Sequence, residues 1–118
     1  MKTIFVVDDN ATNLVMAKSA LNCAYNTFTM LSAAKMLSLT KKIMPDLILL
    51  DLEMPEMNGF EALSILKSDE KLKIIPVAFL TSRHDAESKR RAFEMGAIDF
   101  IHKPFSPPAL INRIEAHI

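Results

Sequence analysis

Three short runs of consecutive apolar residues constrain the fold of this chain more than any other feature. They lie at Ile4–Val7, Leu47–Leu50 and Ile74–Leu80, and their lengths suit strands rather than helices. A strand with no polar alternation is buried on both faces, as in a parallel sheet covered by helices. Two further runs complete the set of predicted strands: Tyr25–Met30, which alternates polar and apolar residues, and Ile98–Ile101.

Helical patterns occupy the stretches between these runs. Ser32 and Ser106 are candidate N-caps, Pro107 suits a first helical position, and Gly96 suits the residue just beyond a helix end. The apolar stripes are formed by Leu14, Ala17, Leu21 and Ala24; by Ala33, Met36, Leu37 and Thr40; by Ala62, Leu63 and Leu66; within Ala86–Met95; and by Leu110, Ile111, Ile114 and Ile118. Strict alternation of strand and helix predicts an α/β fold of the (βα)5 type, a doubly wound parallel sheet with helices on both faces.

Composition narrows the class of protein. A length of 118 residues suits a single domain spanning residues 1–118. The 14 Lys and Arg residues balance the 14 Asp and Glu residues, so no net charge favours nucleic acid or an anionic membrane as a direct partner. No apolar run approaches the ~18 residues that span a bilayer, and no secretory signal is visible. We expect a cytoplasmic protein in which the single cysteine, Cys23, is buried.

Polar side chains follow four of the predicted strands where each strand ends. Asp8 and Asp9 follow the first strand, Asp51 the third, Thr81 the fourth and Lys103 the fifth. In open parallel sheets, ligands bind outside the carboxyl ends of the strands, where the strand order reverses. We therefore expect these side chains to share one pocket.

The residue types in this pocket predict phosphate chemistry with a metal ion. Three neighbouring carboxylates repel one another and lose hydration, and a divalent cation relieves both problems. Oxygen ligands without His or Cys point to Mg²⁺, with Mn²⁺ as the alternative, rather than to zinc. Lys103 and Thr81 add a positive charge and a hydroxyl for phosphate oxygens. The set is typical of phosphoryl transfer to a carboxylate, which gives an acyl phosphate.

Four segments in order resemble the receiver domains of two-component response regulators, and the resemblance covers essentially the whole chain. The segments are VVDDN at Val6–Asn10, DLILLDLEMPEMNGFEAL at Asp46–Leu63, VAFLTS at Val77–Ser82 and GAIDFIHKPF at Gly96–Phe105. The resemblance implies a CheY-like, flavodoxin-like sheet with strand order 2-1-3-4-5. It also implies a domain that accepts a phosphoryl group from a sensor histidine kinase or a phosphotransfer protein, and not an enzyme that turns over external substrates.

The resemblance further implies roles for the acidic residues. Asp51 is then the phosphoacceptor. Asp9, Asp51 and the backbone carbonyl of Glu53 bind Mg²⁺ directly, while Asp8 acts largely through water. Glu53 and Arg83 flank this site, and their charges are expected to tune dephosphorylation.

The remaining implied roles concern the switch. Lys103 pairs with the phosphoryl oxygens, Thr81 moves to hydrogen-bond them, and Phe100 swings inward as Thr81 moves. The Lys103–Pro104 peptide bond is expected to be cis. The face formed by the fourth helix, the fifth strand and the fifth helix then engages an output domain or a partner protein, or forms a homodimer on phosphorylation.

Three other functions stay open on the residues alone. A dinucleotide-binding enzyme shares the architecture, but the chain has only two glycines and no Gly-rich turn after its first strand. An acid-cluster phosphatase would need a second acid close to the nucleophile, and Glu53 has that spacing. The third is an interaction module that works without phosphorylation.

Several residues also have ordinary structural explanations. Asn10 or Asp9 is a fair N-cap for the first helix, and Thr81 begins what could be a simple turn. No metal-ligand spacing links His84, His102 and His117, so we expect none of them to be catalytic. The final segment KPFSPPALINRIEAHI resembles receivers joined to catalytic output domains, which favours a receiver cut from a longer protein over a stand-alone one.

Overall fold

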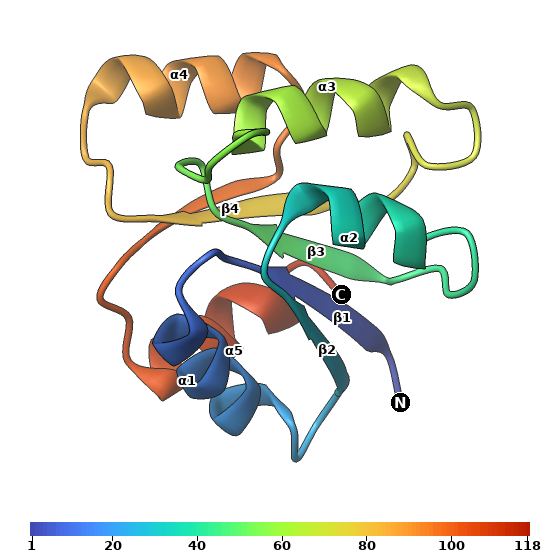
Figure 1. The fold of residues 1–118 in the computed structure, drawn as a ribbon. Coiled ribbons are helices and arrows are strands. Elements are labelled where there is room, and N and C mark those ends of the chain that lie inside the picture. The colour runs from blue at the N-terminus through green and yellow to red at the C-terminus, as the bar shows by residue number, and fades with distance from the viewer.

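The computed structural model describes residues 1–118 as strands and helices in strict alternation (Figure 1). The strands are β1 (Thr3–Val7), β2 (Asn26–Met30), β3 (Leu47–Leu50), β4 (Val77–Thr81) and β5 (Asp99–His102). The helices are α1 (Ala11–Leu21), α2 (Ala33–Leu39), α3 (Gly59–Ser68), α4 (Ala86–Glu94) and α5 (Pro107–Glu115). None of these helices has the length and hydropathy needed to cross a membrane.

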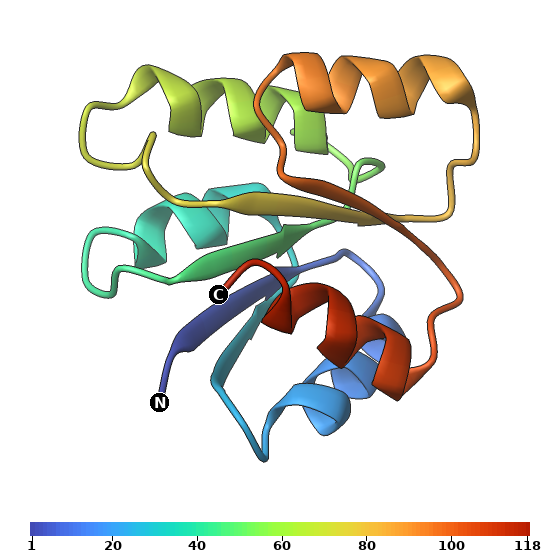
Figure 2. The same ribbon diagram turned by 180° about the vertical axis from the view of Figure 1, so that it is seen from behind.

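The five strands form one parallel sheet in the order β2-β1-β3-β4-β5. The predicted (βα)5 architecture and its strand order are therefore confirmed. Two helices, α1 and α5, cover one face of the sheet, and α2, α3 and α4 cover the other (Figures 1 and 2). The order reverses between β1 and β3, whose last residues, Val7 and Leu50, lie side by side. This register brings the residues that follow both strands to the same edge of the sheet.

The apolar run of β3 explains why the sheet can be covered on both faces. All four of its residues are fully buried, and they alternate between two cores. Ile48 and Leu50 belong to the core beneath α2, α3 and α4, whereas Leu47 and Leu49 belong to the core beneath α1 and α5. Because neither face of β3 meets water, the strand holds the residue that follows it in a rigid position.

Helix ends follow the predicted capping residues. Ser32 and Ser106 cap α2 and α5, and Pro107 opens α5. Gly96 follows the C-cap of α4 with a φ of 103°, a conformation that favours glycine. Asn58 caps α3 through a capping box, in which its side chain and that of Glu61 each accept a hydrogen bond from the other residue's backbone N–H.

Several details differ from the expectations. Strand β4 begins at Val77 and not at Ile74, because Ile74 is 75% exposed and Pro76 has no N–H for a strand ladder. Strands β2 and β5 each begin one residue later than expected, and β1 begins one residue earlier. Strands β4 and β5 each end one residue later, so Thr81 is the last residue of β4 and does not follow it. Cys23 is exposed and not buried, because the chain turns just beyond α1 before entering β2.

Candidate functional site

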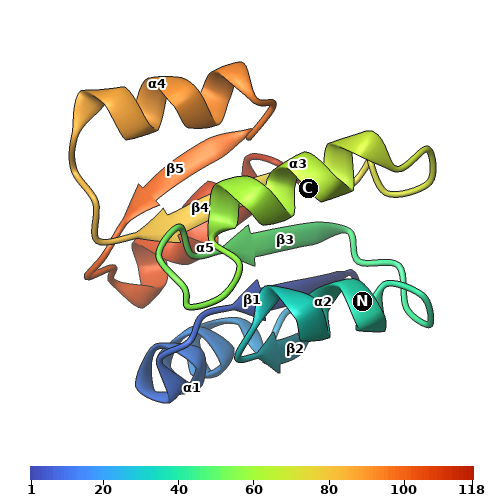
Figure 3. The same ribbon diagram turned by 45° about the horizontal axis from the view of Figure 1, so that its top comes forward.

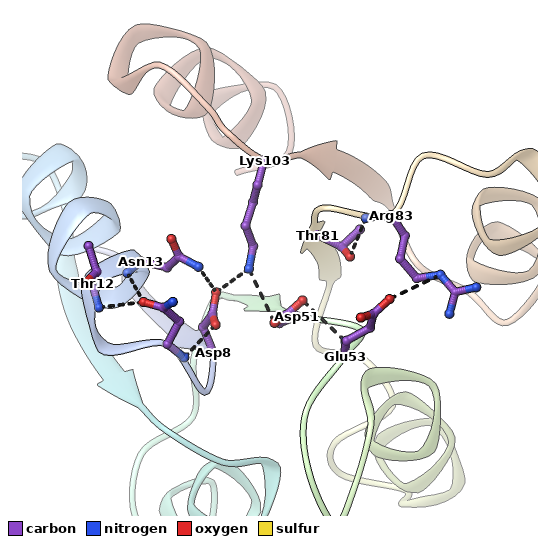
Figure 4. A network of polar contacts seen from close by, with 9 residues as sticks. Asp8, Thr12, Asn13, Asp51, Glu53, Thr81, Arg83 and Lys103 are labelled. Atoms are coloured by element: carbon purple, nitrogen blue, oxygen red, sulfur yellow. Dashed lines mark hydrogen bonds and ion pairs between the residues drawn. The ribbon is translucent and has the colours of Figure 1, made fainter.

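Three carboxylates gather at the ends of β1 and β3 (Figure 4 shows two of them, Asp8 and Asp51). Asp8 and Asp51 are buried, with 2% and 6% of their surface exposed, whereas Asp9 is exposed. One oxygen from each of the three carboxylates lies within 4.8 Å of the others. The cluster predicted from the strand ends is therefore present, with one member open to solvent.

Lys103 reaches this cluster from the segment that follows β5 (Figure 4). Its Nζ lies 2.6 Å from Oδ2 of Asp8 and 3.4 Å from Oδ2 of Asp51. The Lys103 backbone N–H donates to the carbonyl of Thr81 at 2.8 Å, which ties the segment after β5 to the end of β4. The Lys103–Pro104 peptide bond is cis, as predicted.

Asp8 is held by more partners than the sequence indicated. Its Oδ1 accepts from the backbone N–H of Asn10 at 2.9 Å, and its Oδ2 accepts from the side-chain amide of Asn13 at 3.2 Å. The Asn10 side chain caps α1 by accepting from the backbone N–H groups of Thr12 and Asn13. Asn10 is thus the cap, which leaves the Asp8 and Asp9 carboxylates for the site. Asn13 was not among the site residues predicted from the sequence. Its position in the first turn of α1, close to Asp8, is the one sequence signal for this contact.

The Asp51 carboxyl is a weaker acid than an ordinary aspartate side chain. Burial raises the pKa of its carboxyl from 3.8 to about 6; the charge of Lys103 lowers the pKa in part, and that of Asp8 raises it. The Glu53 backbone N–H donates to Oδ1 of Asp51 at 3.4 Å. A carboxyl group shifted by burial and by a like charge in a cleft is a candidate functional group.

The loop between Asp51 and α3 packs closely against the backbone of Asp51. The backbone N–H of Gly59 donates to the carbonyl of Leu52 at 2.9 Å. A Cβ at position 59 would overlap the backbone oxygen of Asp51 and lie 2.9 Å from the Cα of Leu52. The sequence marked Gly59 only as part of a turn, yet its missing side chain is what lets the loop pack against the backbone of Asp51.

Thr81 and Phe100 belong to the neighbouring strands β4 and β5. Thr81 is fully buried, and its hydroxyl accepts from the backbone N–H of Arg83 at 3.2 Å. The Phe100 ring is also buried and packs edge-to-face on Phe79, with ring centroids 6.4 Å apart. The Phe100 ring is therefore buried while the Thr81 hydroxyl still bonds its own loop.

Glu53 and Arg83 face each other across the mouth of the site (Figure 4). Nε of Arg83 lies 3.6 Å from Oε1 of Glu53 and 3.2 Å from Oδ1 of Asp85. An open cavity of about 490 Å³ lies beneath them and reaches Asp9. Its walls are formed by Asp9, Leu52, Glu53, Met54, Pro55, Asn58, Phe60 and Arg83. A small phosphorylated group has room to approach the carboxylates from this side.

The donor set fits a hard divalent cation. Two of the three carboxylates are buried, and Lys103 is the cation that contacts both of them. The nearby donors are oxygens, with no imidazole or thiolate among the three clustered acids. Such a set suits Mg²⁺, which takes a few carboxylates and keeps several waters.

Comparison with known proteins agrees with the fold and the site described above. Residues 4–115 match the family described as "Response regulator receiver domain". The chain is 35% identical over 116 residues to a "Probable cyclic di-GMP phosphodiesterase" of Vibrio cholerae, covering 98% of the chain but 26% of that protein. It is 32% identical over 118 residues to the "Polar-differentiation response regulator DivK" of Brucella ovis, covering 99% of the chain and 96% of that protein. The chain thus spans about a quarter of the first relative and nearly all of the second.

Solved structures show the same architecture. The chemotaxis protein CheY4 of Vibrio cholerae superposes with a TM-score of 0.94 at 27% identity, covering 100% of the chain and 99% of that structure. The BeF3-activated DrrB receiver domain superposes with a TM-score of 0.88 at 29% identity, covering 99% and 97%. An acidic triad such as Asp8, Asp9 and Asp51 is typical of the Mg²⁺ site in proteins of this kind.

Proposed function

This chain belongs to the response regulator receiver family, and we propose that Asp51 is its phosphoacceptor and Mg²⁺ its cofactor. A receiver domain is the phosphoacceptor of a two-component relay, and it works with a histidine kinase. It is a regulatory domain and not an enzyme that turns over external substrates. We further propose that residues 1–118 form a single receiver that acts in the cytoplasm.

The position of Asp51 is the observation that carries this proposal. It follows the central strand β3, its carboxyl is buried, and its pKa is raised to about 6. In the proposed step, a carboxylate oxygen of Asp51 attacks the phosphorus of a phosphohistidine on the partner. The new O–P bond forms as the P–N bond breaks, and the imidazole leaves with the bonding pair and takes a proton.

Asp9, Asp51 and the backbone carbonyl of Glu53 would hold Mg²⁺ directly, and Asp8 would hold it through water. When bound, the ion neutralises negative charge on the transferring phosphoryl group. Lys103 already contacts both buried carboxylates, so its ammonium is in place to pair with phosphoryl oxygens. Asp8 keeps the lysine oriented toward Asp51 through the 2.6 Å contact.

Thr81 and Phe100 would transmit the effect of phosphorylation at Asp51 to the surface of the domain. The Thr81 hydroxyl leaves the Arg83 backbone N–H, its present donor, and donates to a phosphoryl oxygen. The buried Phe100 ring then swings inward into the space that Thr81 leaves. The face formed by α4, β5 and α5 would then engage an output domain, a partner protein or a second copy of the chain.

The surroundings of Glu53 disfavour the phosphatase alternative. A second catalytic acid must reach the leaving group of an external substrate. The Glu53 carboxylate instead lies 3.6 Å from Arg83 on the rim of the site. We propose that this pair governs access of water to the acyl phosphate.

Intact-mass measurement after incubation with acetyl phosphate and Mg²⁺ tests the proposal. The wild-type chain should gain one phosphoryl group, and EDTA should prevent the gain. Asp51→Asn should abolish it, whereas Asp69→Asn should not. Asp69 is a suitable control because Asn retains the oxygen that accepts from the backbone N–H groups of Lys71 and Leu72. An undiminished adduct on Asp51→Asn would disprove the assignment.

A further inference from the structure

Two histidines that are far apart in the sequence lie against each other at the surface. His84 belongs to the loop between β4 and α4, and His102 is the last residue of β5. Their ring centroids are 4.4 Å apart, with 49° between the ring planes. The parallel pairing of β4 with β5, in which Thr81 lies opposite His102, brings the two segments together (Figure 3).

The ring nitrogens of both histidines are available to a ligand. Both residues are exposed, and no hydrogen bond or ion pair of the protein engages either ring. The third histidine differs, because Nε2 of His117 lies 3.0 Å from Oδ2 of Asp99. The His102 ring also packs edge-to-face on Phe100, with centroids 5.6 Å apart. This contact helps to fix the position of the His102 ring.

We propose that His84 and His102 form a two-histidine site for a borderline transition-metal ion such as Ni²⁺, Cu²⁺ or Zn²⁺. Neutral imidazole is a preferred ligand of these ions. Two nitrogens bound to one tetrahedral ion at ~2.0–2.1 Å are roughly 3.3 Å apart. The two rings, with centroids 4.4 Å apart, are close enough for one nitrogen of each to bind the same ion once the side chains rotate and the rings move slightly apart. Water would complete the coordination.

The two cations adjacent to these histidines in the sequence are paired with carboxylates. Arg83 precedes His84, but its guanidinium is paired with Asp85 and Glu53. Lys103 follows His102, but its ammonium points to Asp8 and Asp51. The two cations are therefore directed away from the histidine pair, toward carboxylates. This site is chemically distinct from the carboxylate cluster, because its donors are nitrogens.

An ion at this site would link two segments that the proposed switch uses. His84 lies three residues after Thr81, and His102 lies two residues after Phe100. A bound ion would tether the β4–α4 loop to the end of β5 and restrict movement of Thr81. This consequence depends on the proposed function, whereas the metal site itself does not.

Calorimetric titration of Ni²⁺ into the full chain, with excess Mg²⁺ present to occupy the carboxylate cluster, tests the site. One ion should bind per chain. His84→Gln and His102→Gln should each weaken Ni²⁺ binding by at least about tenfold. Removing a residue that only hydrogen-bonds to a metal ligand already costs about that much, and these variants remove a ligand itself. His117→Gln is the matched control and should bind Ni²⁺ as the wild type does, and so should Asp51→Asn.

Two results would overturn the proposal: no Ni²⁺ binding by the wild type, or unchanged affinity in either His84→Gln or His102→Gln. Both side chains are exposed, so the variants should fold, which circular dichroism would check. Phosphorylation by acetyl phosphate is measured in a separate experiment without Ni²⁺. A chain that accepts phosphate but binds no Ni²⁺ would refute the histidine site alone.

Discussion

Replacing Asp51 by Asn should make the metal-free protein more stable at neutral pH. Burial holds the pKa of the Asp51 carboxyl at about 6 in the folded chain, against 3.8 ordinarily. Between these values the folded state binds more protons than the unfolded state, so stability falls as the pH rises through this window. The ionised Asp51 is therefore a destabilising group in the folded chain at pH 7.

The size of the effect follows from the two pKa values. At about 1.4 kcal/mol for each pKa unit, the difference between 3.8 and about 6 corresponds to about 3 kcal/mol. The carboxylate is 8% exposed, so solvent screens little of this. We expect Asp51→Asn to raise the free energy of unfolding by about 1.5–3 kcal/mol at pH 7.5, and the gain to vanish below about pH 4.

Urea denaturation in EDTA, repeated between pH 4 and pH 8, measures this difference. Glu56→Gln is a matched control, because it removes one negative charge from an exposed side chain that no ion pair of the protein engages. Its stability should stay within about 0.5 kcal/mol of the wild type. Adding Mg²⁺ should stabilise the wild type more than Asp51→Asn and narrow the gap. Equal or lower stability of Asp51→Asn at pH 7.5 would refute the reasoning.

Three further variants examine other parts of the fold. Gly59→Ala should destabilise the chain by about 1–3 kcal/mol and slow labelling by acetyl phosphate, because the new methyl group overlaps the backbone oxygen of Asp51; normal labelling and stability would contradict this. Arg113→Gln should lower stability by about 1–2 kcal/mol at pH 7, because Arg113 donates to the largely buried Asp99. Burial raises the pKa of Asp99, but these hydrogen bonds outweigh it and hold the pKa at about 2. The difference between wild type and Arg113→Gln should therefore shrink as the pH falls from about 4 toward 2, as urea midpoints would show. Asn58→Ala should cost about 0.5–2 kcal/mol through loss of the capping box at α3, and unchanged thermal unfolding would argue against that contribution.

The elements and the outline of the site could be predicted because both depend on short-range pattern. A run of four apolar residues at Leu47–Leu50 identifies a strand buried on two faces wherever it is placed. Once the strands are parallel, the residues that follow them must meet at one edge, as Asp8, Asp51 and Lys103 do. Strand ends were less predictable: Ile74 is as apolar as Ile75, yet Ile74 is exposed whereas Ile75 is buried in the core.

The particular contacts between distant segments lay beyond the sequence pattern. The strand ends place Asp8 and Lys103 in one pocket but do not indicate that they lie 2.6 Å apart. The same holds for His84 and His102, which no ligand spacing links but which strand pairing places together.

The sequence by itself determined the alternation of strands and helices, the polar residues at the strand ends and hence the chemistry of the site. These follow from side-chain periodicity and residue type, which act over a few residues. Only the tertiary structure decided which of those polar groups are buried, which pair with one another, and how Asp51 acquires its raised pKa. Burial and electrostatic interaction depend on all the neighbours in space, and the folded chain draws those neighbours from every part of its length.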